Sequence, residues 1–219
     1  MSMDLGLYDE RLRGVHLIQG IGLSSNIYVI GRRMVTLIDT GVGNRPNAVW
    51  PRLRALGIGP EDLAQVVITH AHHDHVGGIF QILELASPKV FLHPMDARYI
   101  AGYLGPNLVR VEDGDVVETE IAPLEVIHTP GHTAGGICLY AKEKRLLFSG
   151  DTVFPEGLYG AYQGESGSLE EMVNSLRRLT ELDVDILLAG HGEPLFHGGR
   201  DHIRLAYKKA LRRYESLRR

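Results

Sequence analysis

Short apolar runs separated by polar, glycine-containing turns recur along the chain. Runs rich in β-branched residues predict strands in the first half at 14–20, 26–30, 34–38, 66–69 and 89–93. The second half repeats the pattern, with strands predicted at 115–117, 124–127, 137–140, 146–148 and 185–189. Apolar residues at helical spacing predict helices at 48–56, 78–85, 95–103, 168–182 and about 199–218. The pattern therefore predicts an α/β protein with two sheets face to face, flanked by helices.

Local signals mark the ends of two predicted helices. Pro46 opens the helix at 48–56 and Gly57 closes it. Ser168, with Glu171 three residues later, has the form of a capping box. The C-terminal helix is expected to turn one apolar stripe inward, formed by Ile203, Tyr207, Leu211, Tyr214 and Leu217.

The strand predicted at 66–69 ends in a histidine-rich stretch. Its last residue is followed by His70-Ala71-His72-His73-Asp74-His75 and then by two glycines. Imidazole and carboxylate groups hold zinc or iron at neutral pH, and a core does not need four histidines in six positions. On extended backbone, side chains two residues apart point the same way, so His70 and His72 can bind one ion. Asp74 and His75 diverge from that pair where the chain turns, which suits a second ion.

Three further turns repeat the pattern of an apolar strand followed by a histidine or aspartate beside glycine. They contain His132, Asp151 and His191. Together with His70, His72, Asp74 and His75 of the first cluster they supply five histidines and two aspartates. This set provides three neutral nitrogens for one metal ion, two nitrogens and a carboxylate for another, and one bridging carboxylate.

Composition narrows the class of function. The chain has 219 residues, 44% hydrophobic and 23% charged, which fits one domain over 1–219 with an ample core. The net charge of -4 gives no reason to expect a nucleic-acid partner. No apolar run is long enough to span a bilayer, and the N-terminus lacks a signal-peptide pattern. With its single cysteine, Cys138, placed in a strand, we expect a cytoplasmic protein with a small-molecule substrate and no membrane partner.

Four motifs in combination resemble the metallo-β-lactamase fold superfamily. They are Thr-His-Ala-His-His-Asp-His-Val-Gly-Gly at 69–78, His-Thr-Pro-Gly-His-Thr at 128–133, Phe-Ser-Gly-Asp-Thr at 148–152 and Gly-His-Gly at 190–192. They occur in the order typical of that family. The resemblance implies a four-layer αββα sandwich of two mixed sheets flanked by helices, with metal ions at one edge of the sheets.

The resemblance also implies roles for individual residues. The first metal ion would be held by three histidines and the second by two histidines and an aspartate: His70, His72 and His132, then Asp74, His75 and His191. Asp151 would bridge the two ions, and Asp39 resembles the aspartate that orients a ligand histidine. Two divalent ions are implied, zinc in the first place, with iron or manganese as alternatives.

Within the superfamily, the compact length and the short gap before His132 are most similar to glyoxalase II and its small relatives. That similarity implies a hydroxide bridging the metals and attacking a thioester or ester carbonyl. Asp74 would be catalytic, orienting the hydroxide and carrying a proton to the leaving group. The chain departs from glyoxalase II in having one helix after Pro194, and in having Gly160-Ala161 where relatives often place an arginine.

Two other activities of the superfamily stay open. Acyl-homoserine lactonases place a tyrosine three residues after the bridging aspartate, where this chain has Phe154. A persulfide dioxygenase, which is an oxidoreductase, would use a single iron held by His70, His132 and Asp151. The motifs do not separate a dioxygenase from a hydrolase, because such dioxygenases retain the remaining ligand-type residues.

The other histidines and two tyrosines receive separate interpretations. His73 is assigned to a pocket wall or the surface. Structural positions are expected for His93 and His128, and surface positions for His197 and His202. The glycine-rich segment 157–167 is expected to form a loop over the site. Its Tyr159 and Tyr162 would either hydrogen-bond a substrate or pack in the core.

Overall fold

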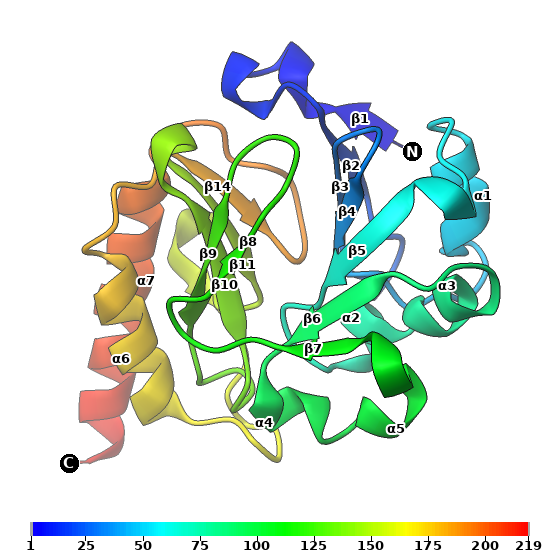
Figure 1. The fold of residues 1–219 in the computed structure, drawn as a ribbon. Helices are drawn as coiled ribbons and strands as arrows, with labels where there is room; N and C mark the ends of the chain where they lie inside the picture. The colour runs from blue at the N-terminus through cyan, green and yellow to red at the C-terminus, as the bar shows by residue number, and fades with distance from the viewer. Residues whose placement is uncertain (1, 219) are drawn as a thin grey trace.

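The computed structural model describes residues 2–218, and its strands form two large sheets packed face to face (Figure 1). The first sheet has seven strands in sequence order: β1 (Ser2–Asp4), β2 (Val15–Ile18), β3 (Ile27–Ile30), β4 (Val35–Ile38), β5 (Leu63–Val67), β6 (Lys89–Leu92) and β7 (Leu108–Arg110). Neighbours from β1 to β4 are antiparallel, and neighbours from β4 to β7 are parallel. Both β3 and β4 are buried along their whole length, because the sheet is covered on both faces.

The second sheet has five strands in the order β14-β11-β10-β9-β8. Their bounds are β8 (Val116–Val117), β9 (Leu124–His128), β10 (Ile137–Ala141), β11 (Leu146–Gly150) and β14 (Ile186–Ala189). Only the β11–β14 pair is parallel in this sheet, so β9, β11 and β14 all run in the same direction. A separate hairpin joins β12 (Val153–Phe154) and β13 (Leu158–Tyr159).

Helices cover the outer faces of both sheets (Figure 1). The first sheet is covered by α1 (Val49–Arg54) and α3 (Ile79–Leu85), and the second by α6 (Leu169–Leu179) and α7 (Gly199–Leu217). The short helices are α2 (His73–Val76), α4 (Pro94–Ala97) and α5 (Ala101–Leu104). Single 3-10 turns lie at Leu5–Leu7, Glu10–Leu12, Pro60–Asp62, Gly105–Asn107, Lys142–Lys144 and Pro155–Gly157.

Three apolar clusters separate the layers. One lies between the first sheet and its helices and includes Trp50 and Ile79. The second fills the space between the sheets, where Tyr28 packs edge-on against Phe148. The third lies between the second sheet and α6 and α7, and it contains Cys138. The predicted αββα sandwich is therefore confirmed, as is the buried strand position of the cysteine.

The helix predicted at 95–103 is wrong as a continuous element. The chain instead forms α4 and α5, and Ile100 between them leaves the helical region with φ of −131°. Ala97, Ile100 and Leu104 still all enter the apolar core beside the first sheet. The apolar spacing identifies these buried side chains, but it does not reveal a break between two short turns.

Three other expectations are corrected. The edge strands β1 and β7 were not predicted, because three residues give too short an apolar pattern. The segment 157–167, expected to be all loop, contributes β13. In α7, Ile203, Tyr207, Leu211 and Tyr214 pack inward as predicted, together with Ala206 and Ala210, but Leu217 is 58% exposed. Among residues 2–218, no helix is long and apolar enough to cross a bilayer.

Candidate metal centre

The carboxyl ends of five strands bring the polar turns together at one edge of the two sheets. In the first sheet, the parallel strands β4 and β5 lead to Asp39 and to His70. In the second sheet, β9, β11 and β14 run in one direction and lead to His132, Asp151 and His191. Strands that run in the same direction end at the same side of a sheet, so residues far apart in sequence meet there.

Three histidines from both sheets form what we call the first triad: His70, His72 and His132. The Nε2 atom of His70 lies 3.1 Å from Nδ1 of His72, which lies 2.9 Å from Nε2 of His132. Ligand atoms around a tetrahedral zinc lie about 3.3 Å apart, because Zn–N bonds are about 2.0 Å long. The three nitrogens therefore have the spacing that one metal ion requires.

The second triad consists of Asp74, His75 and His191. The Nε2 atom of His191 lies 3.2 Å from Oδ2 of Asp74 and 3.3 Å from Nε2 of His75. The remaining pair, His75 Nε2 and Asp74 Oδ2, is separated by 3.7 Å. These distances again suit a single ion, here with one carboxylate among the ligands.

Asp151 lies between the two triads. Its Oδ1 atom is 3.4 Å from Nε2 of His75, and its Oδ2 atom is 3.6 Å from His132 and 3.5 Å from His191. Oδ1 is buried and has no hydrogen-bond partner within the described chain. A buried carboxylate oxygen without a partner is costly, and a metal ion would satisfy it. The residues present therefore fit two ions with Asp151 between them.

Hydrogen bonds to the Nδ1 atoms orient three histidines so that their Nε2 atoms face the site. His75 Nδ1 donates to Asp39 Oδ2 at 2.8 Å, and His132 Nδ1 donates to the carbonyl of Ala161 at 2.6 Å. The hydroxyl of Thr69 donates to Asp39 at 2.8 Å and so accepts from His70 Nδ1 at 3.1 Å. Each of these bonds fixes the tautomer in which Nε2 can bind a metal.

Burial sets the protonation of the first triad. His70 is 2% exposed, and burial followed by repulsion from His75 holds its pKa well below the usual value. Burial and the neighbouring His132 also lower the pKa of His72. Neutral imidazoles are the form that binds metal, so these two side chains are prepared for an ion at neutral pH.

Charge sets the protonation of the second triad. Burial opposes an imidazolium at His75, but the carboxylates of Asp39 and Asp151 raise its pKa well above the usual value. A hydrogen bond to Asp74 raises the pKa of His191. Burial works against ionisation of Asp74, yet the hydrogen bond from His191 and the charge of His75 lower its pKa to about 2. Asp74 is thus a carboxylate throughout the neutral range.

The loop between β2 and β3 holds the backbone of the second triad. The N–H of Ser25 donates to the carbonyl of Asp74 at 3.1 Å, and the N–H of Asn26 donates to the carbonyl of Gly190 at 2.8 Å. The Asn26 side chain donates to the carbonyl of Gly192 at 2.9 Å. Sequence reasoning missed Asn26, because an asparagine before a strand is equally typical of an ordinary turn.

Gly190 must be a glycine because the metal centre packs against it. A Cβ atom there would collide with Oδ1 of Asp151 and lie 2.7 Å from Cε1 of His75. A larger residue would therefore displace the carboxylate shared by the two triads.

The structure brings all seven predicted metal-binding side chains together and leaves the other histidines outside. His73 is exposed, and His197 is exposed beside Asp185. His202 is only partly exposed, and its Nδ1 accepts the N–H of Glu156 at 2.6 Å. His93 and His128 stack on each other with ring centroids 4.0 Å apart.

The glycine-rich segment 157–167 does reach the site. Its Ala161 carbonyl anchors His132, and Ser166 helps to line a hollow of about 160 Å³ beside His72. Tyr159 and Tyr162 pack against the apolar cluster under α7, where the hydroxyl of Tyr162 accepts from Arg213 at 3.4 Å. Packing is therefore the role that the contacts of these two tyrosines support.

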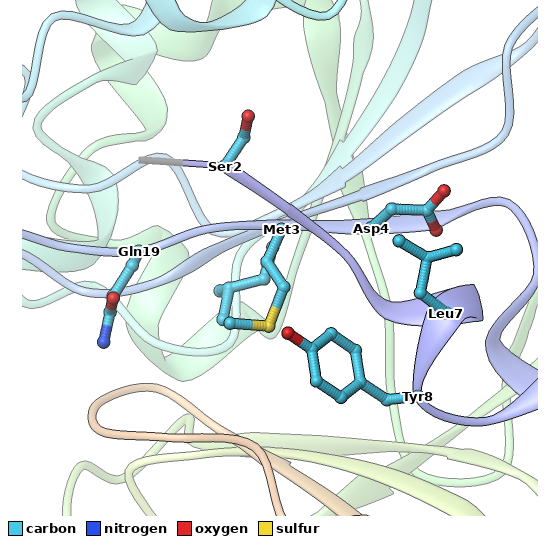
Figure 2. Close-up of a pocket in the computed structure, with 7 residues that line it drawn as sticks. Ser2, Met3, Asp4, Leu7, Tyr8 and Gln19 are labelled. Carbon is cyan, nitrogen blue, oxygen red and sulfur yellow. The ribbon is translucent and has the colours of Figure 1, made fainter.

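A second hollow, of about 290 Å³, lies away from the ligand side chains, along the N-terminal segment. Figure 2 shows Met3, Leu7 and Tyr8 around it. Tyr8 also stacks on Phe196, with ring centroids 5.2 Å apart. The lining of this hollow is mainly apolar and includes none of the predicted metal-binding residues.

Comparison with known proteins identifies the family. The sequence model of the metallo-beta-lactamase superfamily matches residues 20–191, which include every residue of both triads. The chain belongs to the metallo-beta-lactamase superfamily. A solved structure of a metallo-beta-lactamase family protein from Thermus thermophilus covers 93% of this chain and 81% of its own, with a TM-score of 0.78 and 24% identity.

Two further similarities bear on chemistry. Hydroxyacylglutathione hydrolase of Pseudomonas paraeruginosa is 36% identical over 155 residues, which are 70% of this chain and 54% of that protein. A second solved structure, of a protein in a di-iron-bound form, is 25% identical with a TM-score of 0.69 and covers 88% of this chain and 96% of its own. The chain spans about half the length of the curated relatives it matches.

Proposed function

We propose that this chain is a metal-dependent hydrolase that binds two divalent ions and cleaves a thioester. The observation that carries the proposal is the pairing of two triads with Asp151 between them, its Oδ1 atom buried and without a partner in the described chain. The similarity to a hydroxyacylglutathione hydrolase supports an acyl thioester as the substrate class, and the di-iron-bound neighbour supports two ions.

The metal ions would polarise the carbonyl and lower the pKa of a water molecule enough for it to attack near neutral pH. The first triad would hold one ion through three neutral imidazoles, and Asp74, His75 and His191 would hold the other. Zinc suits this set of nitrogen and carboxylate ligands, and iron and manganese are accepted by similar sets.

Asp74 has the properties of the catalytic carboxylate. Its side chain is 31% exposed, so its second oxygen can reach a molecule arriving from solvent. With a pKa of about 2 it is ionised at neutral pH and can accept a hydrogen bond from an attacking water. It can then carry that proton to the leaving thiolate. The His191 contact holds the carboxylate in place during this exchange.

The first experiment is elemental analysis of the chain purified without added metal, combined with turnover of acyl-glutathione thioesters. About two zinc or iron ions per chain, with thioester cleavage that a chelator abolishes, is the expected result. One iron per chain with oxygen consumption on a persulfide would instead support the dioxygenase, with its iron held by His70, His132 and Asp151. Cleavage of acyl-homoserine lactones in preference to thioesters would support a lactonase.

Replacing the catalytic carboxylate tests its role directly. Asp74→Ala should lower kcat at least about 100-fold, the usual contribution of a positioned acid–base group, while the chain retains the ion of the first triad. His197→Ala removes an exposed histidine far from the ligands and serves as the matched control. Near-wild-type turnover of Asp74→Ala would contradict the assignment.

A further inference from the structure

Asp96 is a fully buried carboxylate that belongs to neither triad. It lies in α4, the short turn after β6, and β6 runs parallel to β5. Its side chain is 0% exposed. A buried carboxylate needs strong hydrogen-bond donors around it, so the donors that Asp96 uses show what it holds together.

Its two oxygens accept three hydrogen bonds from the two loops that carry the first triad. Oδ2 accepts from the N–H of Ala71 at 2.8 Å and from the hydroxyl of Thr133 at 2.9 Å. Oδ1 accepts from the N–H of Gly135 at 2.8 Å. Ala71 lies between the two histidines of the first loop, and Thr133 directly follows His132. One carboxylate therefore links ligands that come from different sheets.

The surroundings of Asp96 keep this link short and rigid. A Cβ atom at Gly135 would lie 2.6 Å from both the nitrogen and Oδ1 of Asp96, so only glycine allows the approach. His93 accepts the N–H of Met95 and caps the turn that carries Asp96. His93 also stacks on His128, whose Nε2 donates to the carbonyl of Ala134 at 2.9 Å.

The histidine most dependent on this link is His72. Its inward nitrogen contacts the other two histidines of the triad. Its ring is only half-buried, so its place follows that of the backbone that carries it. That backbone is held by Asp96 through Ala71. The second triad, by contrast, is held by Ser25 and Asn26 of the β2–β3 loop.

We propose that Asp96 is a positioning residue that fixes His72 relative to His132 and thereby sets the metal affinity of the first triad independently of the second. The inference rests on the proposed metal centre. By this proposal, the buried side chain of Asp96 aligns two ligand loops that come from different sheets.

The test measures zinc binding rather than turnover. The metal-free chain is titrated with zinc against a chromophoric chelator in two variants that each keep one triad. The variant His191→Ala keeps the first triad intact, and the variant His72→Ala keeps the second triad intact. Asp96→Asn replaces one acceptor oxygen with an amino group, so it loses the Gly135 bond or the pair to Ala71 and Thr133.

Asp96→Asn should weaken zinc binding about 10–100-fold where the first triad remains, as is usual when a residue supporting metal ligands is changed. In the background that keeps the second triad, the affinity should stay within about threefold. Equal weakening in both backgrounds would show a general loss of structure and overturn the inference. No weakening in either would overturn it as well.

Two variants of Thr133 cover the case in which Asp96→Asn does not fold. Thr133→Val removes one of the three bonds and keeps the branched shape of the side chain, and it should weaken zinc binding at the first triad by a smaller factor, about 3–10-fold. Thr133→Ser keeps the hydroxyl and should bind as the parent does. If Thr133→Val also binds as the parent does, the inference fails.

The matched control is Asp185→Asn. This carboxylate also accepts a backbone N–H, from Gly198, and a side-chain donor, from Arg11, but at the opposite end of β14 from the site. It should leave both affinities unchanged. A wild-type chain that binds no zinc, iron or manganese would remove the metal centre itself, a result separate from a failure at Asp96 alone.

Discussion

The two triads resemble each other in spacing but differ in how they are charged and held. The first consists of three histidines, and burial keeps two of them neutral. The second includes Asp74, and its His75 faces the buried carboxylates of Asp39 and Asp151. One ion would thus bind to neutral nitrogens, whereas the other would bind where negative charge is already concentrated.

The hydrogen bonds that hold the two triads in place also differ. In the first triad, other bonds orient the rings of His70 and His132, and one side chain, that of Asp96, bonds to both ligand loops. The second is held from the β2–β3 loop by two backbone bonds and by the side chain of Asn26. Two sites of similar geometry can therefore have different weak points: a single carboxylate in one, and a distributed set of bonds in the other.

The largest loss of bound metal and of turnover is expected from a change at Asp151, which lies between the two triads. Asp151→Asn keeps the shape of the side chain but removes the negative charge that both ions would share. We expect the chain to lose at least one ion and turnover to fall more than about 1,000-fold, because the arrangement of both metals is disturbed. Elemental analysis and thioester hydrolysis measure the two effects. A variant that kept two ions and full turnover would show that Asp151 is not the shared ligand.

A change at Asp39 should affect the zinc affinities of the two triads to different extents. Asparagine tolerates the positive φ of 59° at Asp39, so Asp39→Asn should keep the backbone while weakening the bonds to His75 and Thr69. Zinc affinity should fall about 10–100-fold at the second triad and less at the first, which Asp39 reaches only through Thr69. Zinc titration in the same two single-triad backgrounds measures the difference. A loss confined to the first triad would contradict the assignment of Asp39 to His75.

The smallest expected effect is on the free energy of unfolding, and it comes from His93, which stacks on His128 beside the first triad. Burial and the neighbouring His128 lower the pKa of His93 to about 4, whereas Asp96 and Asp113 act in the opposite direction. Because this pKa is below the unfolded value of about 6.5, the stability from neutral His93 is complete above pH 6.5 and decreases as the pH falls toward 4. After allowance for solvent screening, we expect the loss to reach about 1 kcal/mol at pH 5.

His93→Asn tests this pH dependence, because asparagine can still cap α4 but does not titrate. The free energy of unfolding of the metal-free variant and parent should differ more at pH 7 than at pH 5, by about 1 kcal/mol. His197→Asn, at an exposed histidine, should show the same difference from the parent at both values. A constant difference for His93→Asn would show that the pKa of this histidine is the same in the folded and unfolded chains.

Some features followed from sequence because they depend on local pattern. Short apolar runs predicted most of the strands, and the ends of those runs predicted the polar turns. The failures have a common cause. The break near Ile100 and the three-residue strands β1 and β7 are set by contacts with distant segments, which a local apolar pattern does not contain.

The superfamily, the αββα fold and the chemical type of the seven candidate ligands were predictable from the sequence, because dense histidines beside strand ends form a local and specific pattern. The side chains that support those ligands became visible in the folded structure alone. Asp96 and Asn26 have no distinguishing neighbours in the chain, and they act through loops that the sheets bring beside them. Positioning across two sheets is a property of their packing, so it becomes visible only when the strands are assembled.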